Sequence, residues 1–111
     1  MPINLTQHEP GSFSVHFDCG ENAVDPFVHK LGHVPSGYFW ESVAKYLVTT
    51  EAPHLEGRFE YDPEAGMFAA FSIDKPALEE LGERLGKLLD DPGALSALVQ
   101  SAEADDFEFE D

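Results

Sequence analysis

The feature that most constrains the fold is a pair of alternating segments on either side of a five-residue turn. Gly57, Phe59 and Tyr61 alternate with charged residues before the turn. After it, apolar residues recur at every second position as a matching set: Met67, Ala69, Phe71 and Ile73. The turn itself, residues 62–66, reads Asp-Pro-Glu-Ala-Gly, which places proline and glycine where a hairpin turn favours them. The pattern predicts two antiparallel neighbouring strands.

A further strand and a short helix are predicted before this hairpin. Residues 12–18 alternate, with Phe13, Val15 and Phe17 on one face, as in a half-buried strand. Asp25-Pro26 is typical of an N-cap followed by proline in a first helical turn, although a start near Glu21 also fits. Gly32 would end this helix, whose inward residues are Phe27, Val28 and Leu31.

Capping residues and the spacing of apolar residues predict three longer helices. Ser36-Gly37 can start a helix that ends before Pro53; its apolar stripe is Trp40, Val43, Ala44 and Leu47, and its polar face is Glu41, Ser42, Lys45 and Thr49. Asp74 can cap a helix over residues 76–89, with leucines 78, 81, 85, 88 and 89 inward and glycines 82 and 86 allowing close packing. Asp91-Pro92 caps the last helix, which buries Leu95, Leu98, Val99 and Ala102.

The element order is therefore β-α-α-β-β-α-α, an α+β fold in which helices pack on a small antiparallel sheet. We expect one domain over residues 1–111, with residues 1–11 as a loose lead-in. Residues 103–111 form an acidic C-terminal segment that also carries Phe107 and Phe109. This segment could add as an edge strand, form an exposed hook for a partner, or pack its phenylalanines on the last helix.

The charge balance limits the possible partners. The chain has 22 acidic and 6 basic residues, for a formal net charge of −16, and 42% hydrophobic residues, enough for a core. Such a field repels nucleic acid and anionic lipid and attracts basic proteins. Alternatively, the acidity serves only solubility or adaptation to a salt-rich cytoplasm.

The chain lacks the signals of export and of a membrane span. Cys19 is the only cysteine, so no internal disulfide can form. No apolar run approaches the roughly 20 residues that cross a bilayer, and the first residues lack the basic and apolar regions of a signal peptide. We therefore expect a cytoplasmic location and no membrane partner.

Candidate catalytic chemistry is sparse. His29 and His33 are four residues apart, but Gly32 interrupts the helix between them and no third ligand is evident. Nucleophile motifs and phosphate-binding glycine loops are absent, and Cys19 is more typical of a small buried residue than of a reactive thiolate. We predict no catalytic residues, no cofactor and no metal site. A small metal-dependent enzyme that uses His29, His33 and carboxylates is the alternative from another class.

Aromatic and acidic residues gather in two short segments and are the candidates for binding a protein partner. Tyrosine is enriched at binding hot spots, and carboxylates can pair with lysine and arginine of a partner. Trp40 lies on the apolar stripe and is expected in the core instead. The candidate partner-binding residues are Tyr38, Glu41, Glu60, Tyr61, Asp62 and Glu64.

These two segments also carry a family resemblance. The run from Gly37 to Glu41, Gly-Tyr-Phe-Trp-Glu, together with the run from Glu60 to Phe68 resembles the immunity protein 51 family of bacterial polymorphic toxin systems. The resemblance covers most of the chain. It implies a small acidic α+β protein of the cytoplasm that binds and blocks a cognate toxin, which in such systems is often a nuclease with a basic surface.

The leading hypothesis is thus a protein that neutralises a toxin by covering it with an acidic surface. A second hypothesis is an acidic mimic of nucleic acid that inhibits DNA- or RNA-handling proteins. The sequence does not fix the oligomeric state.

Overall fold

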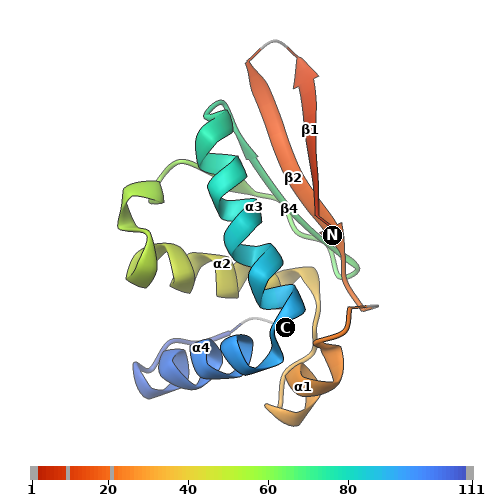
Figure 1. The fold of residues 1–111 in the computed structure, drawn as a ribbon, viewed down its shortest axis with the longest axis vertical. Helices are drawn as coiled ribbons and strands as arrows, with labels where there is room; N and C mark the ends of the chain where they lie inside the picture. The colour runs from red at the N-terminus through yellow and green to blue at the C-terminus, as the bar shows by residue number, and fades with distance from the viewer. Residues whose placement is uncertain (1–2, 10, 21, 110–111) are drawn as a thin grey trace.

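The fold is a four-stranded antiparallel sheet with helices on one side (Figure 1). The computed structural model describes residues 3–9, 11–20 and 22–109. The sheet has the order β1-β2-β4-β3, with strands β1 (Asn4–Glu9), β2 (Ser12–Asp18), β3 (Glu60–Tyr61) and β4 (Met67–Ser72). The helices are α1 (Asp25–Lys30), α2 (Gly37–Glu51), the 3-10 turn η1 (Pro53–Leu55), α3 (Lys75–Asp90) and α4 (Pro92–Ala104). This architecture confirms the α+β prediction.

Helices α2 and α3 pack on the same face of the sheet. The Trp40 ring of α2 meets Phe17 of β2 edge-on, with 5.3 Å between ring centroids. Gly82 of α3 lies over Val15 of the same strand. Helix α4 contacts both α2 and α3, and α1 contacts α4; these two helices lie at the lower end of the molecule in Figure 1. The core therefore lies between one sheet face and the helices.

The N-terminal residues differ from the prediction, because residues 4–9 form an edge strand and not a loose lead-in. Strand β1 pairs antiparallel with β2, with Leu5 opposite Val15 and Thr6 opposite Ser14. An edge strand has one sheet neighbour and is wetted on its free side, so it needs little apolar patterning. That is why a polar segment gave no strand signal. The observed order therefore begins with two strands where the prediction had one.

The hairpin is antiparallel, as predicted, but its faces are assigned differently. Tyr61 pairs with Ala70 and Glu60 pairs with Phe71, so Tyr61 shares a face with Ala70. That face is buried under the helices, where Phe68 and Ala70 are fully buried. The predicted matching set of β4, at positions 67, 69, 71 and 73, follows the opposite face. A shift of one residue exchanges the two faces of a strand, and β4 is apolar on both, so alternation could not decide between them.

The three long helices start where their caps predicted. Backbone N–H groups donate to the side chains of Ser36, Asp74 and Asp91 at 3.1–3.2 Å. The predicted stripe of α2 and the predicted apolar residues of α3 and α4 are all buried. Ser42, expected on the wet face, is buried too. The reason is that α4 covers a second side of α2.

The short helix α1 is the least accurate part of the prediction. It begins at Asp25 without a side-chain cap, and Phe27 is 39% exposed, although it was expected inside. Val28 is fully buried, as predicted, and so is Val24, which precedes the helix. Helix α1 spans only six residues, so its inward side is short. The two valines that mark this side are four positions apart.

The C-terminal segment packs on the helices, so its described part is neither an edge strand nor an exposed hook; its phenylalanines contact rings of α2 and not the last helix, as the third alternative had it. Asp106 takes a left-handed conformation, with φ 60°, and Phe107 N–H donates to the Ala102 carbonyl at 2.9 Å. These features form a Schellman motif, which reverses the chain. Phe107 then contacts the Tyr46 ring, and Phe109 stacks on Phe39 at 5.5 Å.

Replacement of Gly82 by alanine is expected to raise the free energy of unfolding by about 0.5–1 kcal/mol, because alanine is the better helix former. A Cβ at this position would sit 3.6 Å from Ile3 Cγ2 and 3.7 Å from Val15 Cγ1, which is ordinary van der Waals contact. Urea unfolding followed by circular dichroism measures the change. A loss of stability would show that the helix–sheet packing here is tighter than the structure indicates.

Candidate functional site

The first turn of α2 docks against the β3–β4 turn, and this junction joins the two segments singled out in the sequence. Gly37 N–H donates to the Ala65 carbonyl at 3.2 Å. A Cβ at Gly37 would overlap the carbonyl oxygens of Glu64 and Met67. Only glycine allows the helix backbone to come this close. Gly37 and the turn backbone therefore have a structural role at this point, independent of any binding role of the neighbouring side chains.

The six candidate residues all lie around this junction. Tyr38 follows Gly37 in α2 and is 39% exposed. Glu41 is one helical turn further on, and Glu60 and Tyr61 are the two residues of β3. Asp62 and Glu64 are exposed in the turn itself. The structure therefore brings together side chains that are up to 26 positions apart in the sequence.

Two of the six are engaged within the protein. Lys45 Nζ lies 3.7 Å from Glu41 Oε2 and 5.8 Å from the centroid of the Tyr61 ring. Burial, with the Glu41 carboxylate as a second cause, raises the pKa of Tyr61 to about 12. Tyr61 therefore stays a neutral phenol at physiological pH and is not suited to proton transfer. Lys45 itself was not among the predicted residues, although its spacing of four from Glu41 is a recognisable pairing signal.

The remaining four present a ring and three carboxylates to solvent. Tyr38, Glu60, Asp62 and Glu64 are all exposed, and no lysine or arginine occurs between positions 59 and 74 of the sequence. Strand alternation points Glu60 to the face opposite Tyr61. The junction thus has an acidic, solvent-facing rim that could pair with a basic partner.

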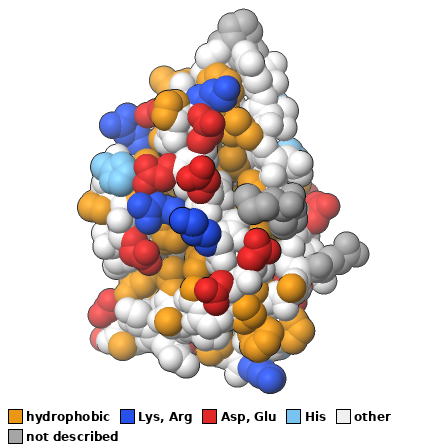
Figure 2. Space-filling view, viewed as in Figure 1, with side chains coloured by type: hydrophobic (Ala, Val, Ile, Leu, Met, Phe, Trp, Pro, Cys, Tyr) orange, Lys and Arg blue, Asp and Glu red, His pale blue; other side chains and the backbone are white. Residues whose placement is uncertain are grey.

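The basic residues are concentrated elsewhere, on and near α3. Arg58, Lys75, Arg84 and Lys87 make up four of the six lysines and arginines. Arg84 pairs with Glu80 at 3.0 Å, and Arg58 pairs with Asp74 at 2.9 Å. Figure 2 shows red and blue side chains mixed on this side of the molecule. The excess negative charge therefore falls on other parts of the surface, including the hairpin turn.

His29 and His33, the pair weighed as metal ligands, lie in different surroundings. His33 packs between the Phe39 and Phe109 rings and lies 3.6 Å from Glu103. His29 is exposed on α1. Within residues 3–9, 11–20 and 22–109, no group of three or more histidine, cysteine, aspartate or glutamate side chains could hold a metal ion. The metal-dependent alternative thus has no supporting geometry in this part of the chain.

Cys19 is half-buried beside the hairpin turn, where its N–H donates to the Gly66 carbonyl at 2.9 Å. Burial, reinforced by the Asp25 and Asp18 carboxylates, raises the pKa of its thiol to about 12. The reactive thiolate is therefore scarce at physiological pH.

We expect Cys19 in the folded protein to react with a disulfide reagent at pH 8 about a hundredfold more slowly than in urea, since unfolding restores an ordinary thiol pKa. The rate should keep rising with pH beyond pH 9, because the folded thiol still titrates there. Absorbance of the released thiolate gives both rates. Equal rates in buffer and urea would contradict the assigned burial.

No helix in the described part of the chain is long and apolar enough to cross a membrane.

Comparison with protein-family models gives a match. The family model described as Immunity protein 51 matches residues 3–104 of the 111 residues. No curated protein and no solved structure matches the chain. The match confirms the family resemblance seen in the sequence and spans every helix and strand of the fold.

Proposed function

The chain belongs to the immunity protein 51 family, and we propose that it binds a cognate protein toxin with a basic surface and occludes it in the cytoplasm. The observation that carries the proposal is the exposed acidic rim at the α2–hairpin junction. Glu60, Asp62 and Glu64 present carboxylates there, and Tyr38, which follows Gly37 in the first turn of α2, supplies an exposed aromatic ring. The chain performs no chemistry of its own in this proposal.

The electrostatic part of the mechanism is steering followed by pairing. Opposite net charges raise association rates by one to three orders of magnitude at low salt, over those of a neutral pair. Carboxylates on a turn can pair with arginine or lysine at the rim of an interface, where the pair stays hydrated; such pairs cost little desolvation and act more on the association rate than on the affinity. The ring of Tyr38 can then add contact area, as aromatic side chains do at hot spots. A basic nuclease is the toxin class that fits this surface best.

Retention at two salt concentrations tests the proposal. The tagged chain is immobilised and exposed to extract of its native strain with the toxin expressed, at about 0.1 M and 0.5 M salt, where screening differs strongly. We expect one basic protein, held in stoichiometric amount at both salts and toxic to cells unless the chain is co-expressed. A set of basic proteins that all dissociate at the higher salt would favour the nucleic-acid mimic. Retention of no protein would count against both.

A further inference from the structure

The central strand β4 is apolar on both faces, but helices cover only one of them. Phe68 and Ala70 face the core and are fully buried. On the opposite face Ala69 is buried, Met67 and Phe71 are half-buried, and Ile73, directly after the strand, is 86% exposed. No described helix packs on that side (Figure 1). A strand with two apolar faces is typical of a sheet covered on both sides, so the free face lacks a layer.

Strand pairing defines the composition of this free face. One row across the sheet consists of Thr6, Ser14, Phe71 and Glu60, and the next contains Asn4, His16 and Ala69. Asp18 pairs with Met67 at the end of the strand nearest the hairpin turn. Among the described residues that pairing places there, the centre of the face therefore holds no lysine, arginine or carboxylate, and acidic residues lie at its margins.

Phe71 already makes a ring contact within the protein, which restricts its side chain before any partner binds. The His8 ring lies 5.7 Å from it, and His8 Nε2 is 2.6 Å from Ser14 Oγ. Ser14 is itself buried. A side chain fixed in this way loses little conformational entropy on binding, which favours it as an anchor.

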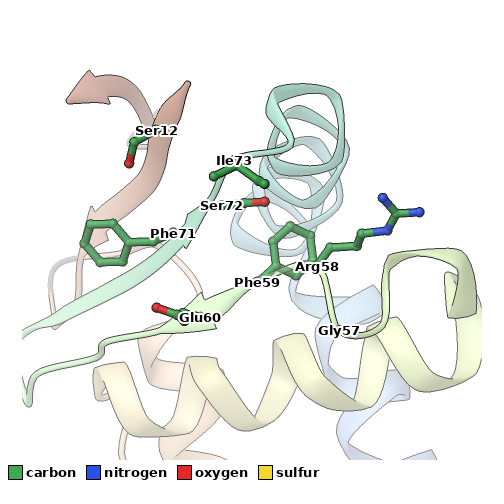
Figure 3. A pocket seen from close by; sticks show the side chains of 8 residues that line it. All are labelled: Ser12, Gly57, Arg58, Phe59, Glu60, Phe71, Ser72 and Ile73. Atoms are coloured by element: carbon green, nitrogen blue, oxygen red, sulfur yellow. The ribbon is translucent and has the colours of Figure 1, made fainter. Parts of the chain in front are cut away.

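A groove of about 350 Å³ opens beside this anchor where β3 stops pairing with β4. Its lining residues are Ser12, Gly57, Arg58, Phe59, Glu60, Phe71, Ser72 and Ile73. Figure 3 shows Phe71 and Glu60 on one side of the strands and the Arg58 side chain extending toward the other. Arg58 is paired with Asp74. The groove thus offers apolar contacts next to an acidic residue, and its one cation is already neutralised.

Charge distinguishes between the possible occupants of the free face. Among the described residues that strand pairing places there, none is lysine or arginine, and Asp18 and Glu60 are acidic. A second copy would bring these margins, and two chains of net charge −16, together without cations to pair them. A basic protein would instead meet carboxylates around an apolar centre, which is the usual anatomy of a protein interface.

We propose that the toxin docks on this helix-free sheet face, with Phe71 and Ile73 as apolar anchors and Asp18 and Glu60 as the acidic margin. The inference rests on the proposed function and names the surface that carries it. Glu60 belongs both to this face and to the acidic rim at the hairpin, so the two surfaces are continuous. The rim would then speed association, and the anchors would slow dissociation.

Once the toxin has been identified by its retention at the higher salt, its affinity for variants of the chain tests the two proposed anchors, Phe71 and Ile73. Calorimetry of the purified toxin compares the wild type with Ile73→Ser and with Phe71→Ser/Ile73→Ser. We expect the single substitution to weaken binding about tenfold and the double about a hundredfold, as for hot-spot residues. Val34→Ser is the matched control, since Val34 is 52% exposed in the α1–α2 connection. It should change affinity by less than about twofold.

Three results would overturn the inference, and each has a different meaning. If all variants bind as the wild type does, the toxin docks elsewhere while the proposed function stands. If the wild type sediments as a dimer that Phe71→Ser/Ile73→Ser dissociates, the occupant is a second copy. If the retention experiment at the higher salt yields no toxin at all, the proposed function itself fails. Should the double variant unfold, Ile73→Ser alone decides, because that side chain is almost fully exposed.

Discussion

Replacing Gly37 with alanine is expected to lower the free energy of unfolding by about 3 kcal/mol and the melting temperature by about 15 °C. The added Cβ would overlap two backbone carbonyl oxygens, those of Glu64 and Met67. Overlap with a side chain can be relieved by a change of rotamer. Here either α2 or the hairpin turn must move, and the Gly37–Ala65 hydrogen bond moves with it.

Gly82→Ala is the matched control, because it makes the same change in another helix. Both substitutions add one methyl group, and helix propensity favours alanine at the interior position 82 and, more weakly, at the first helical position 37. A loss of stability at Gly37 alone would therefore come from the close approach. Thermal unfolding by circular dichroism should therefore give shifts of opposite sign. Equal, small shifts for the two variants would show that the junction has room for a side chain, and that α2 does not depend on the turn.

This result would also separate two roles that the sequence could not. The run from Gly37 to Glu41 and the turn over residues 62–66 stood out together, but a pattern of residues does not say whether it serves folding or binding. The structure assigns Gly37 and the turn backbone to folding, through contacts between main-chain atoms. The side chains of Tyr38, Asp62 and Glu64 are exposed and take no part in these main-chain contacts, so they are available for binding.

The parts of the fold that the sequence predicted are those governed by local rules. Caps such as Ser36 and Asp74 satisfy backbone groups within their own helix, so they can be recognised without a partner. The leucine repeat of α3 likewise shows directly which side of that helix is buried. Strand β1 forms because β2 lies beside it, and the buried face of β4 is set by the helices that cover it. Neither a polar edge strand nor a strand that is apolar on both faces shows this in its own sequence.

The same distinction applies to the candidate site. A turn rich in proline, aspartate and glycine is exposed in almost any fold, so Asp62 and Glu64 could be placed at the surface from the sequence. The half-burial of Tyr61 against Lys45 and Phe68 depends on α2 crossing β3. The apolar set of β4 resembled a core stripe, and only the position of the helices shows that it faces outward.

Reversing two charges on the hairpin turn, with Asp62→Lys and Glu64→Lys, is expected to slow association with the toxin about tenfold at low salt. Both side chains are exposed, so folding should be unaffected. Stopped-flow measurements over a range of salt concentrations give the rate. The effect should shrink as salt rises, since the Debye length falls from about 10 Å at 0.1 M to about 3 Å at 1 M.

The decisive comparison is with Glu79→Lys/Glu83→Lys on α3, which changes the net charge by the same amount. Both glutamates are exposed, and they lie on the side of the molecule where four of the six basic residues already dilute the negative charge. If the acidic rim steers the toxin, the α3 variant should associate nearly as fast as the wild type. If both variants slow association equally, the whole field of the protein attracts the toxin and the rim has no special part. A turn variant that associates at the wild-type rate would remove Asp62 and Glu64 from the proposed site.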